Sequence, residues 1–518
     1  MSDELKKKIG QLFVIGWDGI NPSDDFLQMV NEWGVGGAII FARNISDPRK
    51  IPETLRKIEN AAGTKIFTSI DQEGGLVLRV LSGGSLFPGA MALGATGDVE
   101  LTRRTYEALA LEMLALGLNW NLAPVLDVNS IQNPGIGARS FGDSPTNVKI
   151  FGQAAIRGMR SGGVLSCAKH FPGKGAAKVD SHLSLPVISF SRDELFQRDL
   201  KPFIGAIEEG VDAIMTSHVF FPAFEKQQNL PATLSKSVMT GLLRNELHYD
   251  GLLISDDLEM GAITETYGVA EAAKRAFLAG SDQLAICHEL KWQKNALEAV
   301  YNEVKSSEEA RQRLDESLVR ISKAKRKLEN FSSNESIIEL QKRHSSLISE
   351  AHQKSVLFWR YSENILPIKK ETAFLVVGPK ISALVPVEEC QKEDGLAAFF
   401  KERFPSGISC AYEPKASCEE ILSRVTPLID KLDPEIPILL LSYNAHLFEG
   451  QKNAFSLIAE KHKKSILAAL RNPYDVSAIS EPAIAIAVFG FRTPSLEALC
   501  DALSGKIAPK FGPWPVDL

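Results

Sequence analysis

Residues 164–170 read VLSCAKH, an apolar run of strand length that ends in a lysine and a histidine. A run that is apolar throughout, rather than alternating with polar residues, is typical of a strand buried on both faces of a parallel sheet. Seven further runs of this kind, each followed by a turn cluster and a helical pattern, are QLFVIGW at 11, GGAIIFA at 36, KIFTSID at 65, LNWNLAPVLDV at 118, DAIMTSHV at 212, GLLISDD at 251 and DQLAIC at 282. Eight buried strands that alternate with helices predict a (β/α)8 barrel of the TIM type. A doubly wound open sheet would show similar local patterns, so the prediction depends on the number of strands.

Polar side chains gather at the ends of these apolar runs. They are Asp71, Asp127, Lys169, His170, His218 and Asp256. Each lies at or just beyond the carboxyl end of its run, which is the end of a barrel strand where active sites are built. The pattern therefore favours the barrel and predicts an active site at its mouth.

A second unit follows the barrel. At 518 residues the chain is longer than a single core usually supports. A helical pattern over residues 340–359 precedes four apolar runs, AFLVVGP, PILLLSY, SILAAL and AIAIAVFGF, which predict a mainly parallel sheet with helices between its strands. We therefore expect a catalytic barrel over residues 1–335 and a smaller α/β sandwich domain over residues 336–518, with a stabilising or docking role.

The composition limits the partners and the location that we expect. A net charge of -6 and a pI near 6.0 leave no basic surface for nucleic acid. The first residues lack the apolar region and cleavage site of a secretory signal, and no apolar stretch reaches the ~18 residues of a spanning helix, so we expect neither export nor a membrane partner. Six cysteines without CxxC spacing indicate free thiols in a reducing cytoplasm. No glycine-rich phosphate loop stands out, and we expect no cofactor and no metal.

The segment that begins at the end of the fifth run, KHFPGKGAAKVDSH at 169–182, mixes histidines, lysines and an aspartate with glycines. We expect it to hang over the barrel mouth. Asp180 can accept the N–H of His182, fix its tautomer and favour the imidazolium, which would make the pair a general acid/base dyad. The alternative is a solvated loop whose Asp and His cap a turn, and this is the commoner role of a lone DxH sequence.

Other charged residues near strand ends suit a sugar, because charged side chains can bind hydroxyl groups in bidentate fashion. Asp71 ends the third run, Arg79 follows it by eight residues, and Arg139 lies on the loop after the fourth run. A buried ion pair between Asp71 and an arginine is the alternative. Asp256 and Asp257 follow the seventh run, and only one should point into the mouth because strand side chains alternate between faces. A helix N-cap is the alternative role there.

Six motifs in order resemble glycoside hydrolase family 3, and specifically its β-N-acetylglucosaminidase branch. They are IDQEGG at 70, APVLDV at 123, RSFGDSP at 139, KHFPGKG at 169 with DSH at 180, PATLS at 231 and SDDLEM at 255. The DSH triplet is the feature that separates this branch from the β-glucosidases of the family, which are expected to take their acid from a glutamate of the second domain. The second domain shows no obvious acid of this kind, but Glu363, Glu388 and Glu389 stay open as candidates. The resemblance implies a barrel followed by an α/β sandwich.

The resemblance also implies roles for individual residues. Asp256 would be the nucleophile, and His182 the general acid/base with Asp180 as its partner. The contacts to the terminal sugar would be Asp71, Arg79, Arg139, Lys169 and His170. The implied activity is that of a retaining, exo-acting β-N-acetylglucosaminidase, and the implied substrates are peptidoglycan fragments in cell-wall recycling.

The chain departs from the family pattern at two positions. Lys174 stands where many relatives have histidine, which could favour an anionic leaving portion. Leu76 stands where many have arginine, which could weaken contact to the leaving portion or to the loop.

Several alternatives stay open at this point. A histidine acid/base does not repel phosphate as a glutamate would, so a β-N-acetylglucosaminide phosphorylase is possible, as is a β-glucosidase of the same family. His170, Asp180, His182 and Asp256 could instead bind zinc in a metal-dependent barrel hydrolase, although the first strand lacks the expected HxH pair. A non-catalytic sugar sensor is the remaining alternative, and the oligomeric state is open.

Overall fold

The first part of the chain folds into a closed parallel barrel. The computed structural model describes residues 2–179, 185–329, 333, 335–389 and 395–518. The eight barrel strands are β1 (Phe13–Ile15), β2 (Gly37–Ile40), β3 (Phe67–Ile70), β6 (Trp120–Asn121), β7 (Cys167–Phe171), β8 (Ala213–Thr216), β9 (Leu252–Ile254) and β10 (Leu284–Ile286). Every neighbouring pair is parallel, and β10 pairs with β1. The circle is therefore complete.

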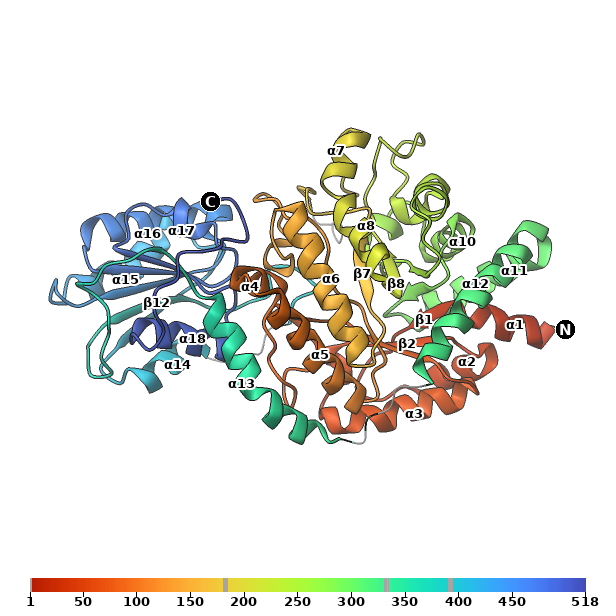
Figure 1. Ribbon diagram of the computed structural model, residues 1–518, viewed down its shortest axis with the longest axis horizontal. Helices are drawn as coiled ribbons and strands as arrows, with labels where there is room; N and C mark the ends of the chain where they lie inside the picture. Colours follow the sequence, from red (N-terminus) through yellow and green to blue (C-terminus); the bar gives the residue numbers. More distant parts are fainter. Residues whose placement is uncertain (1, 180–184, 330–332, 334, 390–394) are drawn as a thin grey trace.

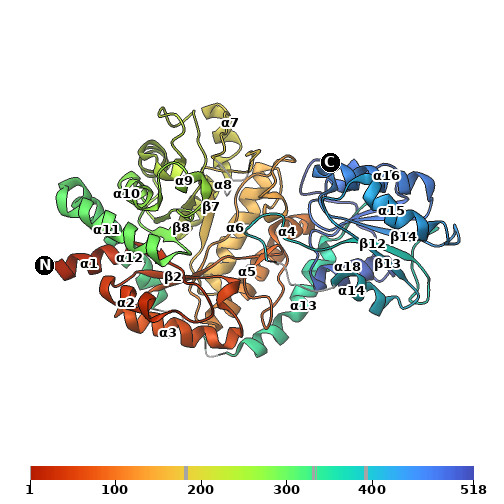
Figure 2. The ribbon, with the colours of Figure 1, turned by 180° about the vertical axis from the view of Figure 1, so that it is seen from behind.

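Helices surround the barrel (Figures 1 and 2). They are α2 (Asp24–Trp33), α3 (Ile51–Ala62), α4 (Ala90–Thr96), α5 (Val99–Ala115), α6 (Pro145–Ser161), α7 (Arg192–Gln197), α8 (Leu200–Glu209), the helix Ser237–Glu246, α9 (Gly261–Thr264), α10 (Val269–Ala279) and α11 (Leu290–Ser306), with α1 (Ser2–Gly10) and α12 (Glu308–Leu328) at the ends of the unit. Their starts follow from local chemistry, since the side chains of Ser23, Asp98 and Ser144 accept backbone N–H groups of the first turns of α2, α5 and α6. Two glycines in the left-handed conformation, Gly34 and Gly63, end α2 and α3.

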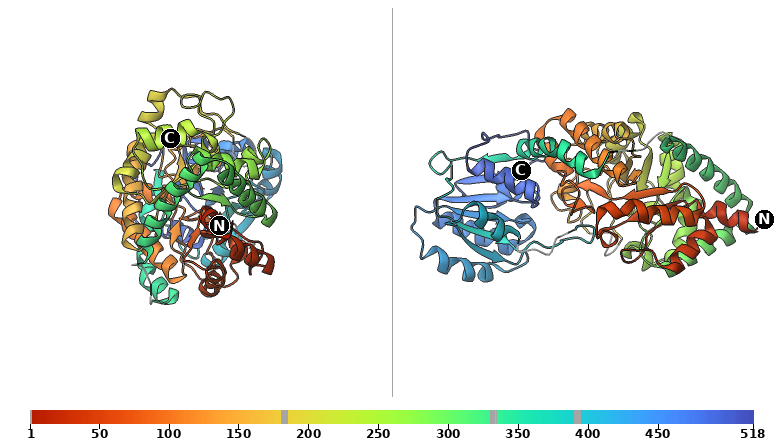
Figure 3. Two further views of the ribbon diagram at one scale, coloured as in Figure 1. Left: turned by 90° about the vertical axis from the view of Figure 1, so that its right-hand side faces the viewer. Right: turned by 90° about the horizontal axis from the view of Figure 1, so that it is seen from below.

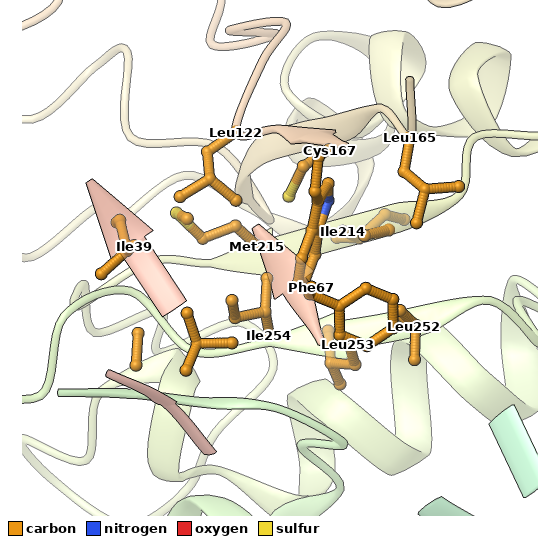
Figure 4. Close-up of a cluster of buried hydrophobic side chains, with 14 of the residues drawn as sticks. Ile39, Phe67, Leu122, Leu165, Cys167, Ile214, Met215, Leu252, Leu253 and Ile254 are labelled. Atoms are coloured by element: carbon orange, nitrogen blue, oxygen red, sulfur yellow. The ribbon is translucent and has the colours of Figure 1, made fainter. Parts of the chain in front are cut away.

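The barrel interior is filled by apolar side chains from several strands (Figure 4). Ile39, Phe67, Ile214, Met215 and Ile254 point toward one another there, and none is more than 4% exposed. The barrel is thus a packed core, and polar groups can gather only at its ends.

The second domain is an α/β sandwich with helices on both faces of one sheet. Its strands are β11 (Leu357–Arg360), β12 (Leu375–Pro379), β13 (Ile408–Tyr412), β14 (Ile438–Ser442), β15 (Ser465–Ala469) and β16 (Ile484–Ala487), and its helices are α14 (Gly395–Arg403), α15 (Cys418–Ile429), α16 (Glu449–Lys461), α17 (Asp475–Ala478) and α18 (Thr493–Leu503). The spatial order is β11-β16-β15-β14-β12-β13, and only β11 is antiparallel to its neighbour. The chain reverses direction across the sheet between β12 and β14, where such sheets usually receive ligands or neighbouring groups.

One long helix joins the two domains, which lie end to end (Figure 3). Helix α13 (Ile337–Ser355) packs against α4 and α5 of the barrel and also against α18 of the second domain. His344 of α13 pairs with Glu112 of α5 at 2.9 Å in a buried position. The relative position of the domains is therefore set partly by this helix.

The predicted barrel followed by a smaller α/β sandwich is confirmed, and the division between residues 335 and 336 stays a prediction. The sequence patterns did not predict β11 and β13. β13 is an edge strand with exposed side chains, so it lacks the continuous apolar run of a central strand. The helical pattern expected over residues 340–359 is wrong at its end, because α13 stops at Ser355 and the buried residues Leu357 and Phe358 begin β11. The five described cysteines, Cys167, Cys287, Cys410, Cys418 and Cys500, are free thiols. Across the described ranges no helix is long and apolar enough to cross a membrane.

Candidate active site

A cavity of about 480 Å³ opens at the carboxyl ends of the barrel strands. Its lining includes six residues that the sequence predicts for the site: Asp71, Arg79, Arg139, Lys169, His170 and Asp256. Three residues of the second domain, Pro386, Val387 and Glu389, complete the wall. A volume of this size is in the usual range for small-molecule sites.

A network of buried charges lies at this cavity. The Lys169 ammonium is 2.7 Å from Asp71 Oδ1 and 2.6 Å from Glu73 Oε1. Arg139 donates two hydrogen bonds to the same Glu73, of 2.9 Å from Nε and 2.8 Å from Nη2. Asp71 is the most open of these four side chains, at 12% exposure. Its carboxylate is therefore the member of the network best placed to accept hydroxyl groups from a bound sugar.

The partners keep these groups charged. Burial by itself would raise the pKa of Asp71, but Lys169 and Arg79 outweigh it and hold that pKa well below its ordinary value. The pKa of Glu73 is also lowered despite burial, by Arg139 and Lys169. Burial acts to lower the pKa of Lys169, yet Asp71 and Glu73 raise it above its ordinary value. The network thus presents fixed charges rather than a group that exchanges protons near neutrality.

Arg79 links the barrel to the second domain. Its Nη2 donates to Asp71 Oδ2 at 3.1 Å, so the buried ion pair considered for Asp71 and an arginine is present. Its Nη1 donates to the Val387 carbonyl oxygen at 2.7 Å and to Glu389 Oε1 at 2.8 Å. The guanidinium lies over the Phe41 ring, 5.3 Å from its centroid. Arg79 lines the cavity, but its two Nη groups already donate to Asp71 of the barrel and to Val387 and Glu389 of the second domain.

His170 is oriented from behind by Asp127. The imidazole Nδ1 lies 2.7 Å from Asp127 Oδ2, and Asp127 Oδ1 accepts the backbone N–H of Lys174 at 2.6 Å. Burial raises the pKa of Asp127 above its ordinary value, although Lys174 opposes the shift. A single carboxyl at the end of the fourth predicted run thereby fixes both the histidine and the turn that follows it. Such a partner sets the tautomer and orientation of an imidazole.

Asp256 lies at the rim, two residues after the end of β9, with 15% of its side chain exposed. Its Oδ1 accepts the backbone N–H of Asp257, and its Oδ2 is 3.8 Å from the Lys174 ammonium. Asp257 and His288 line the same cavity and pair at 3.1 Å, and the Asp257 carbonyl oxygen lies 2.8 Å from His218 Nε2. The two neighbouring aspartates therefore have different surroundings, and Asp256 faces the charges of the cavity.

The structure brings together all six predicted residues that it describes, whereas Asp180 and His182 lie outside the described residues. The roles of all eight stay predictions. The sequence motifs did not single out Glu73, which is the shared partner of Lys169 and Arg139. The signal that could have found it is its spacing of two from Asp71, which places both on one face of an extended segment.

The two positions at which the chain departs from the family pattern lie in different places. Leu76 is buried at 3% exposure in the apolar cluster of the second domain, so it lies away from the cavity lining. Lys174 does reach the cavity, beside Asp256. Within the part of the chain that the structure describes, no three His, Cys, Asp or Glu side chains are grouped so that they could hold a metal ion.

The chain is similar to proteins of known structure and of known name. The solved structure of a glycoside hydrolase family 3 beta-N-acetylglucosaminidase from Paenibacillus sp. str. FPU-7 superposes with a TM-score of 0.90 at 34% identity, and the match covers 99% of this chain and 98% of that one. Beta-hexosaminidase A of Pseudoalteromonas piscicida is 34% identical over 63% of this chain. The match spans 58% of the length of that relative.

A beta-hexosaminidase of Hydrogenovibrio crunogenus is also 34% identical, over 49% of this chain and 72% of its own length. The model of the glycosyl hydrolase family 3 N terminal domain matches residues 4–324, which is more than half of the chain and contains every barrel strand. Together with the barrel and its charged cavity, this match establishes that the chain belongs to glycosyl hydrolase family 3.

Proposed function

We propose that the protein is a retaining, exo-acting β-N-acetylglucosaminidase that removes terminal β-linked N-acetylglucosamine. The observation that carries the proposal is the convergence of Asp71, Arg139, Lys169 and His170 with Asp256 around one cavity at the barrel mouth. These residues come from four different strand ends, and their charges suit a ligand rich in hydroxyl groups.

The proposed reaction has two displacements. The Asp256 carboxylate attacks the anomeric carbon, the glycosidic C–O bond breaks, and protonated His182 donates its proton to the leaving oxygen. His182 then takes a proton from water, which attacks the same carbon and releases Asp256 from the glycosyl ester. Asp180 holds the His182 imidazole. Two inversions retain the anomeric configuration.

The described residues supply the surroundings for this chemistry. The Lys174 ammonium lies 3.8 Å from Asp256 Oδ2, so a positive charge stands beside the proposed nucleophile. Lys169 and His170 are held by Asp71 and Asp127, so hydrogen bonds to the sugar can form without reorganising the site.

The choice of sugar is supported by the relatives, because they are named beta-hexosaminidase and beta-N-acetylglucosaminidase. Peptidoglycan fragments are the substrates that we propose, on the strength of the family resemblance of the motifs. A cytoplasmic location is part of the same proposal.

The experiment is hydrolysis of aryl β-N-acetylglucosaminides by the wild type, Asp256→Ala and His182→Ala. We expect Asp256→Ala to lose nearly all activity. We expect the loss in His182→Ala to shrink as the leaving group becomes better, because such a group needs little protonation. Equal impairment of His182→Ala on all leaving groups would contradict its role, and binding without turnover by the wild type would indicate a sugar sensor.

Phosphorolysis is a second candidate that one observation favours. The Lys174 ammonium faces the cavity beside Asp256 and could attract phosphate in place of water. Release of N-acetylglucosamine 1-phosphate in phosphate buffer would support this reaction, and release of the free sugar alone would exclude it. In the same assay, inhibition by a chelator would point to the metal-dependent alternative.

A further inference from the structure

A short hairpin of the barrel is held by the second domain. Strands β4 (Gln72–Gly74) and β5 (Val77–Leu78) form this hairpin, which lies between Asp71 and Arg79 in the sequence. Leu76 at its turn and Val77 are 3% and 0% exposed and belong to the apolar cluster of the second domain's sheet, not to that of the barrel. The segment that carries cavity residues is thus packed on the other domain.

Arg492 of the second domain fixes the same turn by hydrogen bonds. Its Nε donates to the Gly75 carbonyl oxygen at 2.7 Å, and its Nη2 donates to the Leu76 carbonyl oxygen at 3.3 Å. Nη2 also donates to the carbonyl oxygen of Glu389 at 3.0 Å. One guanidinium therefore joins the hairpin to the segment that contacts Arg79.

That segment is anchored from within its own domain. Glu388 is buried and forms a bidentate pair with Arg471, including a bond of 2.8 Å from Nη1 to Oε2. Glu388 Oε2 also accepts the Leu384 N–H at 2.9 Å, and Arg471 Nη1 donates to the Tyr443 hydroxyl at 3.0 Å. Glu389, the next residue, contacts Arg79, and its backbone position is fixed by the hydrogen bonds of Glu388.

We propose that the second domain is a positioning element of the sugar site, with Glu389 acting as a positioning residue through Arg79. Glu389 and the Val387 carbonyl hold Arg79 Nη1, which leaves Nη2 directed at Asp71. Asp71 in turn holds Lys169. The contacts form a continuous path from the buried Glu388–Arg471 pair to the sugar-binding charges.

This inference rests on the proposed function for its link to sugar binding. A positioning role predicts weaker substrate binding with little change in the chemical step, because Asp256 lies across the cavity on another strand end. It also predicts that removing the Glu389 charge loosens the hairpin, whether or not substrate is present.

The experiment compares Glu389→Gln with Glu413→Gln in the full chain. Glu413 is a matched control because it is a glutamate of the same domain that pairs with a basic residue, Lys380, but on an exposed surface. We expect Glu389→Gln to raise KM for an aryl β-N-acetylglucosaminide about tenfold, as for loss of one charged hydrogen bond, with kcat within about twofold of wild type. Glu413→Gln should match wild type in both.

Two further measurements separate positioning from general damage. Hydrogen–deuterium exchange over residues 77–80 should be faster in Glu389→Gln than in Glu413→Gln without substrate. In an Arg79→Lys background, Glu389→Gln should add little to the KM already reached, because the two residues act through one contact. Full additivity would overturn the role assigned to Arg79.

The outcomes also distinguish this inference from the proposed function. A wild-type protein that neither hydrolyses nor binds the sugar overturns the proposed function, and with it the link to sugar binding. Normal wild-type turnover, with KM and exchange in Glu389→Gln equal to those of Glu413→Gln, overturns the positioning role alone.

Discussion

Two clusters of buried charges lie at opposite ends of the barrel, and they differ in whether their carboxylates face an open cavity. The mouth cluster consists of Asp71, Glu73, Arg79, Arg139 and Lys169. The foot cluster consists of Asp282, two residues before β10, with Arg244, Arg313 and Arg320 around it. Both contain carboxylates that could not be buried without cationic partners.

The carboxylate of the foot cluster is enclosed, although Arg320 at the edge of the cluster lines a separate cavity. Asp282 is fully buried, and its Oδ1 accepts from Arg313 at 2.6 Å and from Ser317 at 3.0 Å. Its Oδ2 accepts from Arg244 at 2.7 Å and from the Leu253 N–H at 3.1 Å. The mouth cluster instead lines a cavity, and Asp71 stays partly exposed there. Buried charge alone therefore does not identify a site, whereas buried charge beside open space at the carboxyl ends of strands does.

The largest effect is expected from Lys169→Met at the mouth. The change leaves Asp71 and Glu73 without their shared ammonium, so kcat/KM should fall about a thousandfold and the free energy of unfolding by about 3 kcal/mol or more. Steady-state kinetics and denaturant unfolding of the same preparation measure both quantities. Wild-type kcat/KM in this variant would show that the mouth cluster is not part of the active site.

A smaller effect, confined to stability, is expected from Asp282→Asn at the foot. The three arginines then lose their negatively charged partner, which should lower the free energy of unfolding by about 3 kcal/mol. Activity per folded molecule should stay within about twofold of wild type, since Asp282 is remote from the cavity lining. A fall in kcat/KM for the folded fraction would abolish the distinction between the clusters.

The smallest effect concerns Asp199, which lies below the turn at Gly173. Its Oδ2 has no partner among the described residues, and burial raises its pKa from 3.8 to about 6. A raised carboxyl pKa contributes stability that is present below pH 3.8 and is lost as pH rises through about 6. Asparagine does not titrate, so the free energy of unfolding of Asp199→Asn relative to wild type should rise between pH 4 and pH 7, by at most about 3 kcal/mol. Thermal unfolding across this range measures the difference, and parallel pH profiles would show that Asp199 is ionised throughout.

Much of the barrel and its site could be predicted from the sequence for a simple reason. Central strands of a parallel sheet are apolar throughout, so β7 and β9 stand out, and the polar residue that ends each one is placed at the mouth by the fold itself. Lys169 and Asp256 are found this way. Partnerships across the chain have no such pattern: nothing near Arg79 indicates that Glu389, 310 residues away, will share its donors.

Leu76 shows the same limit. In the sequence it stands where many relatives have arginine, which suggests a weaker hold on the leaving portion of the substrate. In the folded chain it is buried against a sheet whose strands begin some 280 residues later, a partner that local pattern cannot specify. Edge strands such as β13 were missed for the opposite reason, since their exposed side chains give no burial pattern at all.

Helix α13 determines where the chain can be shortened without exposing apolar surface. Because it lies in contact with α4, α5 and α18 at once, a stop codon just before Ile337 would uncover the apolar side chains that pack against Ile348 and Ala351 and leave Glu112 without its imidazole neighbour. We expect such a fragment to aggregate, whereas one ending after Ser355 would keep these apolar side chains covered. Helix α13 should therefore be kept in a fragment that contains either domain.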